Sequence, residues 1–120
     1  VCDRPLVVEG AGGLMVPLND NAFVIDLAAE LHLPVILVAR STLGTINHTL
    51  LSLEALRRRG LEIAGVVING PEMPHNRVAI ERYGRAPILA EIPKLERLSR
   101  ATLRGIEPEL DLGELARSAS

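Results

Sequence analysis

Aromatic side chains are almost absent from this sequence of 120 residues, which contains Phe23 and Tyr83 but no tryptophan. Proteins that bind single-stranded nucleic acid stack the bases on aromatic rings. The net charge is near −2, so no strong basic field attracts nucleic acid or anionic lipid. We therefore expect neither nucleic acid nor a membrane as a partner, and a core built from valine, isoleucine, leucine and alanine.

Cysteine is nearly absent as well. Because Cys2 stands alone, an internal disulfide and a thiol-rich metal site are both excluded, and a reducing compartment is expected. No apolar run approaches the roughly 20 residues of a transmembrane helix, and no signal peptide is visible. These absences together predict a cytoplasmic protein.

Lysine is also scarce, because Lys94 is the single lysine in the sequence. No glycine-rich segment ending in Gly-Lys-Ser or Gly-Lys-Thr is present, so the usual cradle for nucleotide phosphates is missing. The sequence begins with Val1 and its first apolar run follows at once. We interpret residues 1–120 as a single α/β domain that forms the carboxyl-terminal portion of a longer protein.

Apolar patterning predicts alternating strands and helices. Continuous apolar runs indicate buried strands, and apolar residues spaced by three or four indicate helices. The polar cluster Asn19–Asn21 can cap a helix. The predicted strands are Leu6–Val8, Val35–Ala39, Ile63–Ile68 and Ile88–Ile92, and the predicted helices are Ala22–Leu31, Thr45–Arg59 and Arg77–Tyr83. The remainder is expected to be helical in pieces, broken near Pro108. This order predicts a parallel sheet with helices on both faces.

Polar or glycine-rich loops follow each predicted strand. They are Glu9–Gly13, Arg40–His48, Asn69–Pro71 and Glu91–Leu95. In open parallel sheets, ligands bind outside the carboxyl ends of the strands. We therefore expect these loops to lie on one rim and to form one site.

Three of these loops have both a functional and a structural interpretation. Glu9 suits a Mg²⁺ ion that is held mainly by phosphate oxygens, but it could equally be a solvated acid at a strand end. The start of the helix at Thr45 can bind an anion or be capped by its own side chains. Asn69 can read an adenine edge, or form a simple turn with Gly70.

Taken together, these loops resemble dethiobiotin synthetase. The matching segments are Val7–Gly13, Leu33–Val38, Leu43–His48, Gly60–Leu61 with Gly65–Asn69, and Glu91–Pro93. The resemblance extends to about Leu95. It implies a P-loop NTPase-like fold that here lacks its first strand and its P-loop. It also implies an ATP-dependent ligase of biotin biosynthesis, which converts 7,8-diaminononanoate, CO₂ and ATP to dethiobiotin, ADP and phosphate.

The resemblance also implies residue roles. Glu9 would hold Mg²⁺, and a homodimer would present the substrate-binding segment across its interface to the substrate carboxylate of the neighbouring subunit. The implied nucleotide-binding residues are Glu9, Gly10, Ala11, Gly12, Asn69, Gly70, Pro93, Lys94 and Leu95. The implied substrate-binding residues are Gly12, Leu43, Gly44, Thr45, Ile46 and Asn47. Catalytic residues are expected upstream and not in this chain.

Departures from the family pattern lead to further expectations. Because the phosphate-binding lysine is missing, we expect the chain alone to be inactive. A sheet that lacks a central strand should also expose unpaired edges and favour self-association. Two alternatives remain: another P-loop amidating synthase, such as a cobyrinate a,c-diamide synthase, and a non-catalytic module for dimerisation or regulation.

Overall fold

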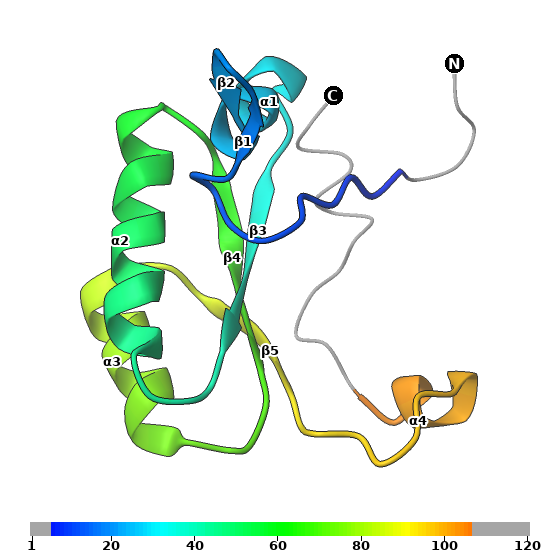
Figure 1. Ribbon diagram of the computed structural model, residues 1–120. Coiled ribbons are helices and arrows are strands. Elements are labelled where there is room, and N and C mark those ends of the chain that lie inside the picture. The colour runs from blue at the N-terminus through cyan, green and yellow to red at the C-terminus, as the bar shows by residue number, and fades with distance from the viewer. Residues whose placement is uncertain (1–5, 107–120) are drawn as a thin grey trace.

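Strands and helices alternate through the computed structural model, which describes residues 6–106 (Figure 1). The elements in chain order are β1 (Pro17–Asn19), β2 (Ala22–Phe23), α1 (Val24–Leu31), β3 (Val35–Arg40), α2 (Thr45–Arg58), β4 (Ile63–Asn69), α3 (Pro74–Gly84), β5 (Ile88–Ile92) and α4 (Arg100–Arg104). The predicted strands from Val35, Ile63 and Ile88 and the helix from Thr45 are confirmed. Pro108 lies outside the described residues.

A parallel sheet of order β3-β4-β5 forms the centre of the structure. Because α2 connects β3 to β4 and α3 connects β4 to β5, neighbouring strands run in the same direction. The register pairs Arg40 with Asn69 and Asn69 with Ile92. The last residues of all three strands are therefore level, which places the loops that follow them on one rim.

Helices α2 and α3 pack together on one face of the sheet (Figure 1). Leu53 of α2 and Ile80 of α3 are fully buried there. They belong to a cluster with Val66, Ile68 and Ile88 of the sheet. Alternation along the strands directs these side chains toward the helices, so the two helices and one sheet face enclose the core.

The other face of the sheet is less covered. Val38 points away from the core side of β3, since its neighbour Ala39 belongs to the core cluster and its neighbour Leu37 packs against that cluster. The Val38 side chain is 64% exposed. Helices were predicted on both faces of the sheet. Among the described residues, α2 and α3 pack on one face, and Val38 on the other face remains exposed.

The first helix starts later than predicted. The cluster Asn19–Asn21 does not cap it but lies at the turn of the antiparallel β1–β2 hairpin, where Asn19 Oδ1 accepts from the Asn21 N–H at 2.9 Å. Asparagine and aspartate also favour turns, so the prediction selected the wrong one of two structures these residues form. The cap of α1 is Phe23, whose N–H donates to the Asp26 carboxylate at 2.8 Å.

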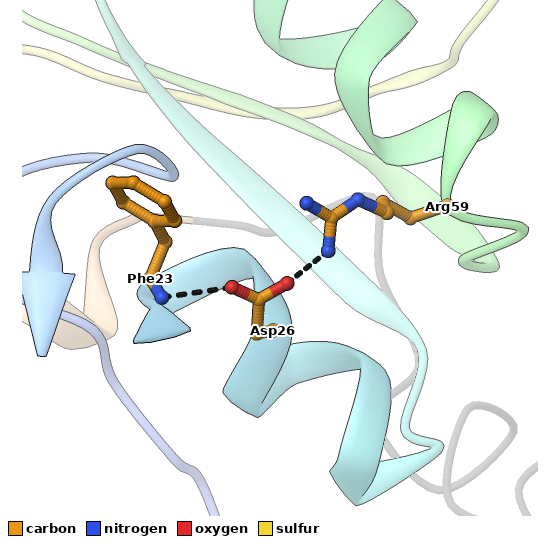
Figure 2. A network of polar contacts seen from close by, with 3 residues as sticks. All are labelled: Phe23, Asp26 and Arg59. Carbon is orange, nitrogen blue, oxygen red and sulfur yellow. Dashed lines mark hydrogen bonds and ion pairs between the residues drawn. The ribbon is translucent and has the colours of Figure 1, made fainter. Parts of the chain in front are cut away.

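Asp26 also connects α1 to the end of α2. Figure 2 shows its carboxylate between the Phe23 N–H and the guanidinium of Arg59, which donates to Asp26 Oδ1. The Phe23 hydrogen bond and then Arg59 hold the pKa of Asp26 below its usual value of 3.8, although desolvation acts in the opposite direction. One carboxylate therefore caps α1 and links it to the carboxyl end of α2.

The predicted strand Leu6–Val8 is wrong. This segment has no strand structure, and Val7 is 83% exposed. A strand requires a hydrogen-bonded neighbour, and no described strand pairs with this segment. The apolar composition of this segment predicts that its side chains favour burial, but it does not predict whether a neighbouring strand is present.

Candidate functional site

The carboxyl ends of the three strands meet at one rim, which is the lower edge of the sheet in Figure 1. Asn69 is the central residue of this rim. Its carbonyl accepts from the Ser41 N–H at 3.0 Å, and the Gly70 N–H donates to the Ile92 carbonyl at 2.9 Å. The structure thus brings together three of the four segments predicted to form the site: those that follow β3, β4 and β5.

Helix α2 begins at this rim without a capping side chain. Gly44 precedes it with φ of 89°, a left-handed conformation that favours glycine. The Thr45 N–H donates to the Thr42 carbonyl at 3.1 Å, and the His48 N–H donates to the Gly44 carbonyl at 3.0 Å. Within the described residues, the N–H groups of Ile46 and Asn47 have no such partner. They form the positive end of a helix dipole.

The hydroxyl groups near this helix start face inward. Thr45 is 2% exposed and Thr49 is 3% exposed, and their Oγ1 atoms lie 3.4 Å apart. The structural interpretation of this segment, in which its own side chains cap the helix, therefore does not hold for Thr45. The amides of the first turn stay available for an anion.

A groove of about 580 Å³ opens beside the start of α2. One wall is formed by α2 and the loop before it, and the other by the first turn of α3. Its lining is mostly apolar, and it includes every residue predicted to bind substrate except Gly12. The lining residues are Leu43, Gly44, Thr45, Ile46, Asn47, Leu50, Met73 and Asn76.

Leu50, Met73 and Asn76 were not predicted. Leu50 follows Ile46 by one helical turn, so helical spacing could have identified it. The helix containing Asn76 was expected to start at Arg77, but it starts at Pro74. Proline is favoured at the first helical position, and this signal would have placed Asn76 in the first turn of α3.

An ion pair holds the end of β5 against α3. Arg77 Nη1 donates to Glu91 Oε2 at 2.6 Å, and both side chains are about 30% exposed. The pair fixes the strand just before Pro93, Lys94 and Leu95. Pro93 and Lys94 are exposed, Leu95 is partly buried, and the chain then leads toward α4 (Figure 1).

The glycine-rich loop with Glu9 is not part of this rim. A Cβ on Gly10 would lie 2.7 Å from Val24 Cγ1, and one on Gly12 would lie 2.9 Å from Val16 Cγ2. Gly10 thus packs against the first residue of α1, and Gly12 packs against the residue just before β1. Figure 1 shows this blue segment apart from the loops where α2 and α3 begin. The predicted convergence of all four loops is therefore not observed, because the preceding segment is not in the sheet.

Glu9 and Ala11 are exposed. The described residues contain no group of three or more His, Cys, Asp or Glu side chains that could hold a metal ion. A Mg²⁺ ion uses only one or two protein carboxylates and keeps water or phosphate as its other ligands. As a single exposed acid, Glu9 has the donor type that such an ion requires.

Comparison with known families places this fold in a class. A family model described as an AAA domain matches residues 2–102. The chain belongs to this family, and its parallel sheet with alternating helices agrees with a P-loop NTPase-like fold.

Curated relatives define the family more narrowly. The ATP-dependent dethiobiotin synthetase of Paramagnetospirillum magneticum is 57% identical over 108 residues, which cover 90% of this chain and 53% of that protein. The corresponding synthetase of Lawsonia intracellularis is 49% identical over 92% of this chain and 54% of its own length. The biotin biosynthesis bifunctional protein of Bordetella avium is 62% identical over 77% of this chain and 20% of its own length. The chain is a member of the dethiobiotin synthetase family.

The chain spans about half the length of the two synthetases.

Among residues 6–106, no helix has the length and apolar character that crossing a membrane requires.

Proposed function

We propose that this chain supplies the substrate-carboxylate groove and the adenine-binding rim of an ATP-dependent dethiobiotin synthetase. The start of α2 carries the proposal, because unpaired amides of Ile46 and Asn47 open beside an apolar groove. The substrate 7,8-diaminononanoate has a carboxylate at the end of an aliphatic chain. The amides match the carboxylate, and the apolar lining matches the chain.

In the proposed reaction, one amine captures CO₂ as a carbamate, and ATP transfers its γ-phosphate to the carbamate oxygen, which forms a mixed anhydride and releases ADP. The second amine then attacks the carbonyl carbon, which closes the cyclic urea and releases phosphate. This chain would bind and orient the reactants. Binding lowers the reaction barrier because the reactants lose translational and rotational entropy before the chemical step. Leu43, Gly44, Thr45, Ile46 and Asn47 would hold the substrate. Catalytic residues are expected outside this chain.

The nucleotide would bind along the rim. Asn69 carries an amide that offers a donor and an acceptor to adenine, and Gly70 lies beside it, packed against Ser41. Pro93, Lys94 and Leu95 follow β5 at the same level and would enclose the base. Glu9 would hold Mg²⁺, which neutralises phosphate charge when bound, and Gly10, Ala11 and Gly12 would line the phosphate and substrate region. Both roles require this loop to lie at the rim in the complete enzyme, whereas among the described residues it packs against Val24 and Val16.

Homodimerisation is part of the proposal. The Leu43 side chain is fully exposed at the edge of the groove, where an apolar side chain gains from a partner surface. In a homodimer, the Leu43–Asn47 segment would face the substrate of the neighbouring subunit.

Calorimetry with 7,8-diaminononanoate tests this function. We expect the chain to bind it at least about tenfold more tightly than the matching diamine without the carboxylate, because hydrogen bonds to charged groups are strong. Gly44→Ala should weaken binding, since a Cβ there would be strained at φ of 89° and 3.3 Å from the His48 ring. Gly105→Ala, in ordinary contact only, is the control. Absence of binding at millimolar concentration, or equal affinity for both ligands, would refute the proposal and favour a non-catalytic module.

A further inference from the structure

A side chain of α3 connects the two walls of the groove. Asn76 Nδ2 donates to the carbonyl oxygen of Ser41 at 2.8 Å. Asn76 lies in the first turn of α3 and lines the groove, whereas Ser41 opens the loop that leads into α2. This hydrogen bond therefore joins the first turn of α3 to the segment before the α2 start.

Ser41 is held from both sides. Its N–H donates to the Asn69 carbonyl at 3.0 Å, and its carbonyl accepts from Asn76. The residue is 1% exposed, and its hydroxyl, which has no hydrogen-bond partner in the described part of the chain, packs against Gly70. A Cβ on Gly70 would lie 2.5 Å from Ser41 Oγ, so there is little room for Ser41 to move.

The loop after Ser41 has few other constraints. The segment Thr42–Gly44 is three residues long, its Leu43 side chain is fully exposed, and its backbone hydrogen bonds lie within the same turn. The direction in which the loop leaves Ser41 therefore acts, together with the packing of α2 on the sheet, on where the Ile46 and Asn47 amides point. Loss of the Asn76 bond would also leave a buried carbonyl unsatisfied, and the loop would have to move to hydrate it.

We propose that Asn76 is a positioning residue that orients the start of α2, and with it the anion-binding amides of the groove. The consequence for substrate rests on the proposed function, whereas the order of the loop does not. Asn76 touches no reacting atom in this proposal and acts through Ser41.

Two substitutions separate this role from a structural role within α3. Asn76→Asp keeps the side-chain shape but, at neutral pH, replaces the donor by a carboxylate that repels the Ser41 carbonyl. As the third residue of α3, an acid there should stabilise the helix. Asn76→Ala removes the donor without adding charge. His75→Ala is the matched control, because His75 is exposed in the same turn.

Hydrogen exchange of residues 41–48 in the ligand-free chain is the direct test. We expect both Asn76 variants to exchange faster there and His75→Ala to match the wild type. Exchange of residues 77–84 should be unchanged or slower in Asn76→Asp, because the acid stabilises the start of α3. Affinity for 7,8-diaminononanoate should fall about fivefold or more in both Asn76 variants.

Unchanged exchange at residues 41–48 in both Asn76 variants would overturn the proposal. So would equal loss of protection across α3 in Asn76→Asp, which would indicate a general structural role. A wild-type chain that does not bind 7,8-diaminononanoate would contradict the proposed function instead, and the exchange measurement would still decide the role of Asn76.

Discussion

Individual glycines set how closely the elements of this chain approach one another. Gly65 lies in β4, where a Cβ would be 2.6 Å from Leu89 Cγ and 2.8 Å from the Pro87 carbonyl oxygen. The backbone atom cannot rotate away as a side chain can. The close approach of the starts of β4 and β5 therefore depends on the missing side chain at this position.

Gly65→Ala should therefore destabilise the protein. Overpacking a well-packed site costs about 1–3 kcal/mol, and we expect urea denaturation to show a loss of this size. Gly13→Ala should leave the free energy of unfolding nearly unchanged, since nothing lies within 4 Å of a Cβ there. Equal stability of the two variants would contradict this account of the β4–β5 contact.

The residues of the candidate site were only partly predictable. Asn69 and the Leu43–Asn47 segment could be predicted because each follows a continuous apolar strand, and the carboxyl ends of parallel strands share a rim. Asn76 could not be predicted as a partner of Ser41, because the two are 35 residues apart. That contact depends on how α3 packs beside α2, which local patterns do not encode.

At the scale of elements, long apolar patterns were the most reliable guide. Ile88–Ile92 was predicted with its observed bounds, and α2 with its observed first residue. The predictions of a strand at Leu6–Val8 and of a helix cap at Asn19–Asn21 were wrong for different reasons. The first required a strand partner that no described residue provides, and the second suits a turn as well as a helix cap.

The junction of α1 and α2 should depend on pH through Asp26. Its pKa is lowered in the folded protein, so its contribution to stability is present above the unfolded value of 3.8 and is lost as the pH falls through the lower folded value. In thermal denaturation, the melting temperature of the wild type should therefore fall more steeply below about pH 4 than the melting temperature of Asp26→Asn.

At pH 7, Asp26→Asn should have the lower melting temperature. Glu54→Gln is the control, because Glu54 and Arg58 form an exposed pair of the kind that contributes little. Parallel pH curves for the wild type and Asp26→Asn would show that this carboxylate does not hold the junction.

At the scale of the whole molecule, the described residues bring together some of the loops that the proposed function requires and not others. The rim and the groove are formed, whereas the Glu9 loop packs elsewhere and the outer edge of β3 has no described partner strand. The single lysine, Lys94, lies outside any glycine-rich loop. These observations agree with a chain that spans about half of its synthetase relatives.

Incorporation of labelled CO₂ into dethiobiotin tests the central claim most directly. The assay compares the chain alone with the chain joined to the amino-terminal part of the Paramagnetospirillum magneticum synthetase, each with ATP and 7,8-diaminononanoate. We predict ATP-dependent product from the joined protein and none from the chain alone. Product formed by the chain alone, or none from a folded joined protein, would contradict the claim that this chain supplies the substrate groove and adenine rim but not the catalytic groups.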